Sequence, residues 1–240
     1  MSQIQVGELV EKNVPTNNES RSKYTSKWDY TLDVSRWHFD KWKVESDPYK
    51  VFMRVEGDWV NDLKDLNFEI DVSTLNYGYK GTDHDPIIEN DYLAWGYKND
   101  MVQYGRTYKL PDSLIRLGES LKLKHPDIRV HQQMPGQVAP IHVDTFCSHP
   151  AMDQDPTLDV SELRRFVIQL TDWDWGHFWA FGNNTWSQWK AGDVVYFESR
   201  DVIHCTANAG KEPRLTMTVT GWMTDETKNL IESDFNIIKI

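Results

Sequence analysis

Residues 138–146 read Val-Ala-Pro-Ile-His-Val-Asp-Thr-Phe, and this short stretch decides how the chain around it is interpreted. It is rich in β-branched residues and follows a Met-Pro-Gly turn at residues 134–136, which is the pattern of a strand entered from a turn. Side chains two apart on a strand project from the same face, so His142 and Asp144 can both reach one metal ion.

A histidine and an arginine farther along the chain complete this pattern. Residues 202–206, Val-Ile-His-Cys-Thr, predict a second strand, and Arg214 follows His204 by ten residues. Two imidazoles and one carboxylate, with open positions left on the metal, suit a non-haem Fe(II) centre. A downstream arginine suits the far carboxylate of a keto-acid co-substrate. The sequence therefore predicts an iron oxygenase.

The His-x-Asp triplet alone would carry little weight, because chance yields about one in a chain of this composition. The sequence holds three, beginning at His38, His125 and His142. The triplet at His125 contains a proline where a helical pattern ends, and only the one at His142 has the context of a strand. His204 is also the only one of eight histidines with an arginine ten residues on. The triplet at His142 and the His204–Arg214 spacing together support the metal site better than either feature does alone.

The residues from Arg214 to Thr220, Arg-Leu-Thr-Met-Thr-Val-Thr, alternate polar and apolar side chains as a half-buried strand does. Arg214 and Thr216 share the polar face, where a guanidinium fork and a nearby hydroxyl could bind a buried carboxylate. The alternative is that Arg214 pairs with a surface acid at the edge of a sheet.

Residues 129–222 resemble the Fe(II)/2-oxoglutarate dioxygenase superfamily, in which His-x-Asp, a long gap, a histidine and an arginine ten residues later form the common pattern. Residues 189–197, Trp-Lys-Ala-Gly-Asp-Val-Val-Tyr-Phe, and the Ala-Asn pair at 207–208 are similar to the aspartyl/asparaginyl β-hydroxylase and prolyl 4-hydroxylase branches. Residues 164–170 also resemble an arginine-bearing strand of the aspartyl branch, although a histidine often found there is Val167 in this chain.

This resemblance implies a set of roles for individual residues. It implies that His142, Asp144 and His204 are the catalytic Fe(II) ligands, and that 2-oxoglutarate and O2 are used with release of succinate and CO2. The far carboxylate of 2-oxoglutarate would meet Arg214 and Thr216, with Arg165 as a further contact to co-substrate or substrate. An aspartate ligand favours hydroxylation over halogenation, because halogenases of the superfamily carry a small residue there. Desaturation, epoxidation or ring closure would use the same ligands.

Two other functions fit parts of the same pattern. A metal-dependent cupin-like enzyme that does not use 2-oxoglutarate would explain the three ligands but would leave Arg214 and Thr216 without a role. A non-enzymatic metal-binding or structural jelly-roll module would need none of these residues to be catalytic.

The expected fold is mainly β with flanking helices, a double-stranded β-helix or jelly roll of the cupin-like kind, because short alternating strands are separated by Gly, Pro, Asn and Asp turns. Residues 178–181 and 186–189 predict a hairpin around a Gly-Asn-Asn turn. We expect residues 129–240 to form the catalytic core. Residues 1–128 would be an N-terminal extension packed on the same domain, with buttressing helices beginning at Asp85-Pro86 and Pro111-Asp112.

Several remaining residues have a structural and a functional interpretation. His149 and His177 are more typical of structural histidines than of histidines that line a cavity. Cys147 and Cys205 are more typical of small buried hydrophobic residues than of metal ligands. A dense aromatic run suggests an apolar substrate face; it consists of Trp173, Trp175, Phe178 and Trp179. The polar residues 147–162 predict either a lid over the site or a solvated loop.

Global properties limit the partners. The net charge of −11 argues against a nonspecific polyanion binder, and residues 215–240 lack the further arginines that nucleic-acid demethylases of the superfamily tend to carry. No stretch approaches ~18 consecutive apolar residues and no secretory signal is evident, so we expect a cytoplasmic protein with no membrane or nucleic-acid partner. The expected substrate is a small molecule or a peptidyl side chain, and the oligomeric state stays open.

Overall fold

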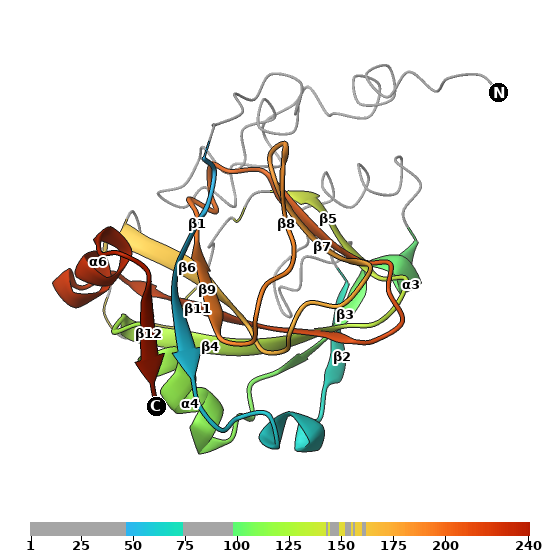
Figure 1. Cartoon of the computed structure of the whole chain (residues 1–240), viewed down its shortest axis with the longest axis horizontal. Coiled ribbons are helices and arrows are strands. Elements are labelled where there is room, and N and C mark those ends of the chain that lie inside the picture. Colours follow the sequence, from blue (N-terminus) through green and yellow to red (C-terminus); the bar gives the residue numbers. More distant parts are fainter. Residues whose placement is uncertain are drawn as a thin grey trace.

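The computed structural model describes residues 47–73, 98–142, 144, 149–151, 155, 157–159 and 162–240. Within them the strands form two sheets that face each other, as a jelly roll requires (Figure 1). The predicted fold, mainly β with flanking helices, is confirmed.

The larger sheet has eight strands, and its neighbours pair antiparallel except for the parallel pair at one edge. In spatial order the strands are β12 (Asn236–Lys239), β1 (Lys50–Glu56), β9 (Asp193–Tyr196), β6 (Leu163–Gln169), β11 (Arg214–Trp222), β4 (Lys124–Gln133), β3 (Gln103–Thr107) and β2 (Glu69–Ser73). β11 is an interior strand of this sheet, because it lies between β6 and β4.

The smaller sheet has four strands in the order β5 (Val138–His142), β10 (His204–Asn208), β7 (His177–Phe181) and β8 (Asn184–Trp186). β7 and β8 pair antiparallel around Gly182, which has a φ of +57° and so takes the left-handed conformation that glycine adopts without strain. The predicted hairpin is therefore present, but its second strand is Asn184–Trp186 rather than residues 186–189, because Asn184 pairs with Phe181 and so belongs to the strand. β5 and β10 are adjacent, which brings the two segments that carry the predicted metal ligands side by side.

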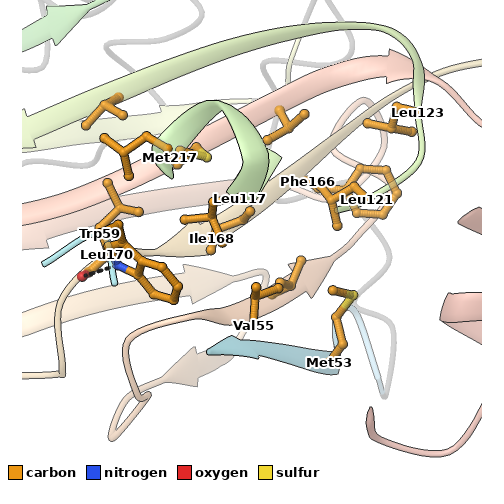
Figure 2. Packing of buried hydrophobic residues seen from close by; sticks show 14 of the residues in the cluster. Met53, Val55, Trp59, Leu117, Leu121, Leu123, Phe166, Ile168, Leu170 and Met217 are labelled. Atoms are coloured by element: carbon orange, nitrogen blue, oxygen red, sulfur yellow. Dashed lines mark hydrogen bonds between the residues drawn. The ribbon is translucent and has the colours of Figure 1, made fainter. Parts of the chain in front are cut away.

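The outer face of the large sheet carries the main apolar core. Leu114 and Leu117 of α4 (Asp112–Glu119) are fully buried there, and Figure 2 shows Leu117 close to Met217 and Ile168 of the sheet. Burying such a side chain stabilises the fold by roughly 1.5–3 kcal/mol. The other short helices are η5 (Asp62–Asp65), a 3-10 turn, α3 (Asn99–Val102) and α6 (Asp225–Glu232), whose N-cap Thr224 closes a capping box.

A second apolar cluster lies between the two sheets. Val167 and Val195 of the large sheet pack with Trp179, Phe181 and Trp186 of the small one. Because this cluster includes side chains from both layers, it holds the sheets face to face. It fills only part of the inner face, and the rest of that face is polar.

The helix predicted to start at Pro111-Asp112 is present, but the prediction that the helical pattern reaches the His125 triplet is wrong. α4 ends at Glu119, and Lys122 and His125 have φ angles of +58° and +52°, which a right-handed helix cannot contain. Residues 125–127 therefore lie in β4.

Several sequence predictions lie outside the described residues. They are the helix at Asp85-Pro86, the triplet at His38, Cys147 and much of the 147–162 segment. The division of the chain at residue 128 stays a prediction, and the structure places β1 and β3 in the same sheet as β6, β9 and β11. None of the described helices is long and apolar enough to cross a membrane.

Candidate metal centre

Three side chains from two segments far apart in sequence meet at one end of the small sheet. His142 and His204 are cross-strand partners on β5 and β10, with their ring centroids 4.2 Å apart. Asp144 lies two residues beyond the end of β5. One donor atom from each of the three residues lies within 4.8 Å of the other two, so together they could hold a metal ion.

Asp144 is fixed in place by its backbone and by one arginine. Its backbone N–H donates to the carbonyl of Ser199 at 2.7 Å, and Nη1 of Arg165 donates to Oδ1 at 2.6 Å. Burial alone would oppose ionisation, but the charge of Arg165, assisted by the side chain of Ser199, outweighs it and holds the pKa of Asp144 below its usual value. The other oxygen, Oδ2, is buried without a hydrogen-bond partner. The carboxylate is therefore ionised and has an oxygen available as a ligand.

Both histidines have a hydrogen bond that selects the same tautomer. Nδ1 of His142 lies 2.6 Å from the carbonyl of Pro140, and Nδ1 of His204 lies 2.9 Å from that of Val202. A carbonyl only accepts, so the proton is on Nδ1 and the lone pair is on Nε2. Metal-binding histidines are commonly oriented by such a bond from the other ring nitrogen.

The two imidazoles are also kept neutral, which is the form that binds a metal. Burial and the neighbouring His142 lower the pKa of His204 to about 3. Burial likewise lowers the pKa of His142. Two neutral nitrogens, one carboxylate and an unpartnered Oδ2 on Asp144 fit the donor set of a non-haem Fe(II) site.

Arg214 lies on the inner face, on the same side of the large sheet as this group. Its side chain is 5% exposed, and its Nε donates to Oε1 of Gln133 at 3.0 Å. The guanidinium lies 5.0 Å from the ring of Trp179, and Nη1 is buried with no hydrogen-bond partner. Burial lowers the pKa of Arg214 to about 9, so the group is still cationic at neutral pH. The alternative of a surface ion pair at a sheet edge is wrong, because β11 is an interior strand.

Thr216 lies beside Arg214 on the inner face, as its spacing predicts. Its hydroxyl donates to Oε1 of Gln169 at 3.3 Å, and Nε2 of Gln169 is buried without a partner. These groups extend the polar wall along β11 and β6. Their roles in binding a co-substrate stay predictions.

The sequence left open whether Arg165 faces the interior. The register places it opposite Thr220 on the inner face, where its Nε donates to the Thr220 hydroxyl at 3.1 Å. The same side chain reaches Oδ1 of Asp144, so it lies next to the metal group. A direct contact between Arg165 and a co-substrate stays a prediction.

Three polar residues of this wall were not identified from the sequence. They are Gln133, Gln169 and Thr206, all buried on the inner side. Gln133 joins the two sheets, because its Nε2 donates to the Thr206 hydroxyl at 3.2 Å while its Oε1 accepts from Arg214. The alternating residues 129, 131 and 133 were the available signal, but only the strand pairing shows which face of β4 looks inward.

The aromatic run does not form one substrate face. Trp179 and Phe181 share the inner face of the small sheet with His204, whereas Phe178 points the other way and is 48% exposed. Trp175 is 80% exposed. Alternation along β7 therefore divides the run between the two faces.

The remaining histidines and the described cysteine have structural environments. His149 and His177 bond through Nε2 to the carbonyls of Thr220 and Glu212, at 3.2 and 3.0 Å. Cys205 is a free thiol on the opposite face from His204, and burial raises its pKa.

No family model and no curated protein sequence matches the chain. Among solved structures, the non-haem α-ketoglutarate-dependent carbocyclase SnoK from nogalamycin biosynthesis is similar over 52% of this chain and 66% of its own, with 16% identity and a TM-score of 0.38. A putative sugar phosphate isomerase from Acidithiobacillus ferrooxidans is similar over 53% and 64%, with 17% identity and a TM-score of 0.31. A predicted oxalate decarboxylase from Thermotoga maritima is similar over 50% of this chain and 82% of its own, with 14% identity and a TM-score of 0.31. What the site can do therefore rests on its own side chains.

Proposed function

We propose that this protein is an Fe(II)- and 2-oxoglutarate-dependent oxygenase that hydroxylates a small-molecule or peptidyl substrate. The observation that carries the proposal is the presence of two features on the inner faces of the two opposed sheets. The first is the His142, Asp144 and His204 group with its unpartnered carboxylate oxygen, and the second is the buried Arg214 with its unpartnered Nη1. Bound Fe(II) would supply the activation of O2 that is coupled to oxidative decarboxylation of 2-oxoglutarate.

The three ligands act by holding the metal in one orientation. His142 and His204 present neutral nitrogens whose direction is fixed by backbone carbonyls, and Asp144 presents the oxygen that Arg165 does not occupy. Arg165 keeps this carboxylate ionised and prevents it from rotating. Three protein donors on one side of an ion leave its other side for co-substrate and O2.

Arg214 supports the choice of a dicarboxylic co-substrate. A buried guanidinium with an unpartnered Nη1 is costly unless an anion completes its hydrogen bonds. In our proposal the far carboxylate of 2-oxoglutarate supplies that anion, assisted by the hydroxyl of Thr216. Gln133 and the ring of Trp179 hold the guanidinium in position before the co-substrate arrives. An ion pair formed in this buried place is stronger than one in water.

Apolar side chains limit access of water to the ligands. The ring of Phe197 lies 4.8 Å from that of His204 and 4.7 Å from that of Phe181. Both phenylalanines are buried. In a site enclosed in this way, reactive species are less exposed to solvent, which favours attack on the bound substrate.

The test is anaerobic titration of the protein with Fe(II) and then 2-oxoglutarate, followed by admission of O2 and measurement of succinate. We expect metal-dependent 2-oxoglutarate binding and O2-dependent succinate, both lost in His204→Ala. Cys205→Ser is the matched control, because its side chain is on the other face of the same strand and should leave both signals unchanged. Metal binding without succinate would instead favour the cupin-like enzyme, and no metal binding at all would exclude both.

A further inference from the structure

The inner face of the large sheet is unusually basic for an acidic protein. Four arginines lie on it, one on each of four neighbouring strands; they are Arg106 on β3, Arg129 on β4, Arg214 on β11 and Arg165 on β6. His131 lies among them, and burial together with the charges of all four lowers its pKa well below the usual value. The overall charge of −11 makes this local excess of positive charge a specific feature.

Two of the four arginines already belong to the proposed metal and co-substrate sites. Arg165 pairs with Asp144, and Arg214 is the proposed site for the far carboxylate of 2-oxoglutarate. Arg106 and Arg129 remain. They lie side by side on β3 and β4, because Arg106 is opposite His131, two residues from Arg129 along the strand.

Aromatic rings hold these two guanidinium groups in place. The ring of Tyr108 lies 5.8 Å from the guanidinium of Arg106 and 5.5 Å from that of Arg129, so it is shared by both. The ring of Tyr104 also lies 5.8 Å from the guanidinium of Arg106. Arg106 also donates to the hydroxyls of Tyr108 at 2.8 Å and Tyr104 at 3.4 Å. Stacking of this kind orients a cation without neutralising it.

The hydrogen bonds of the pair are incomplete. Nε of Arg106 and Nε of Arg129 are each buried with no hydrogen-bond partner among the residues that the structure describes. Arg129 pairs with Asp127, but no carboxylate in the described part of the chain pairs with Arg106. Unpartnered guanidinium donors on adjacent strands are what an anion needs for recognition.

The charge and the exposure of the pair indicate the class of ligand. Two guanidinium groups and the carboxylate of Asp127 leave a single positive charge, which a carboxylate monoanion would balance and a phosphate monoester dianion would not. Tyr108 is 53% exposed and the Arg129 side chain 24%, so a ligand can reach the pair from solvent. β4 lies two strand spacings, about 10 Å, from β6, whose Arg165 contacts Asp144 of the metal group.

We infer that Arg106 and Arg129, together with Tyr104 and Tyr108, bind a carboxylate group of the primary substrate. The inference rests on the proposed function and narrows its substrate to a small carboxylic acid. The acid is held by its carboxylate at β3 and β4 while another part of the molecule reaches the metal. A molecule of small-metabolite size spans the two strand spacings, about 10 Å, between β4 and β6.

The experiment uses the full chain loaded anaerobically with Co(II) and 2-oxoglutarate. Its probes are benzoate, hexanoate and N-acetyl-L-leucine, each with its uncharged carboxamide, and phenyl phosphate. We expect at least one carboxylate to bind, its carboxamide and phenyl phosphate to bind at least tenfold more weakly, and Arg106→Gln to weaken the carboxylate at least tenfold. Arg116→Gln on the exposed side of α4 is the matched loss of charge and should have no effect.

Arg106→Lys is a second variant that keeps the charge but loses the fork. It should retain part of the affinity, and its melting temperature controls for folding. The inference is overturned if no carboxylate binds at 20 mM, if carboxamides bind equally well, or if Arg106→Gln and Arg129→Gln leave binding unchanged. It is also overturned if either variant weakens 2-oxoglutarate instead, because the pair would then serve the co-substrate. Failure of the proposed function is a separate result, the absence of O2-dependent succinate from the Fe(II)-loaded wild-type protein.

Discussion

The two faces of strand β11 have opposite characters although they share one backbone. Leu215, Met217 and Val219 point to the outer face, where they join the apolar core beneath α4. Arg214 and Thr216 point to the inner face, where buried polar atoms lack partners. The outer face is thus packed by apolar side chains, whereas the inner face keeps buried polar atoms without hydrogen-bond partners.

This difference shows which face the fold depends on and which face serves binding. Burial of apolar side chains stabilises the outer face without any bound ligand. On the inner face each unsatisfied buried donor or acceptor costs roughly 1–3 kcal/mol. Such groups persist in a stable protein when a ligand completes them, so damage to the two faces should produce different losses.

The largest effect is expected at the metal group. Asp144→Ala removes the only oxygen donor of the three and leaves Arg165 without its carboxylate partner. We expect metal affinity to fall by at least about 100-fold and succinate formation to be abolished. Anaerobic metal titration and a succinate assay measure the two effects. Retention of full turnover by this variant would show that the metal is bound elsewhere.

Damage to the outer face should have the converse pattern. Leu117→Ala opens a cavity under α4, where the side chain is fully buried, and should lower the free energy of unfolding by about 2–5 kcal/mol. Because Leu117 lies on the other side of the sheet from the ligands, metal affinity of the folded fraction should be unchanged. Urea unfolding and metal titration of the same preparation test both. A loss of metal affinity comparable to that of Asp144→Ala would mean that the two faces are coupled.

The sequence revealed the parts of this arrangement that depend on period alone. Alternation of polar and apolar residues identified β11 and the shared face of Arg214 and Thr216, and the His-x-Asp spacing pointed to the candidate ligands His142 and Asp144 at the end of β5. The end of α4 could not be predicted, because the apolar period continues to Leu121 and only the left-handed conformation of Lys122 interrupts it.

Contacts between strands that are distant in the chain could not be predicted from the sequence. The bond between Gln133 and Arg214 joins residues 81 positions apart, and nothing local shows that these two strands pair. For the same reason the sequence did not predict that Arg106 and Arg129 face inward, since a polar side chain on a strand can face solvent or the interior equally well. Which of the two it faces is fixed by the pairing order of the whole sheet.

A change on the inner face of β11 should separate binding from stability. Arg214→Met removes a buried cation but keeps an apolar side chain of comparable length. A hydrogen-bonded charge contributes roughly 1.5–3 kcal/mol, so 2-oxoglutarate should bind about 10- to 100-fold more weakly. The free energy of unfolding should change little, because removal of the unpartnered Nη1 offsets the loss of the hydrogen bond to Gln133. Calorimetric titration and urea unfolding measure the two quantities, with Arg116→Met as the control; unchanged 2-oxoglutarate binding would exclude Arg214 from the co-substrate site.

The smallest expected effect is on the pH dependence of stability. It is tested by comparing His131, which lies among the inner arginines, with His149, which does not. Burial lowers the pKa of His149, and burial with four arginines lowers that of His131 further. The unfolded chain therefore binds more protons than the folded one below the ordinary histidine pKa of about 6.5, and stability should fall as the pH drops below that value. A histidine that stays neutral in the folded state throughout accounts for about 1 kcal/mol between pH 7.5 and 5.5, and one whose pKa is lowered less accounts for a smaller part of that loss.

Urea unfolding of the metal-free protein at these two pH values measures the loss. His131→Gln keeps a side chain able to bond Thr218 but cannot titrate, so it should reduce the loss more than His149→Gln does. The reason is that the charges of the four arginines act on His131 in addition to its burial. Equal reductions in both variants would mean that the guanidinium charges are screened or already neutralised, and the inner face would then lack the excess positive charge that an anionic substrate requires.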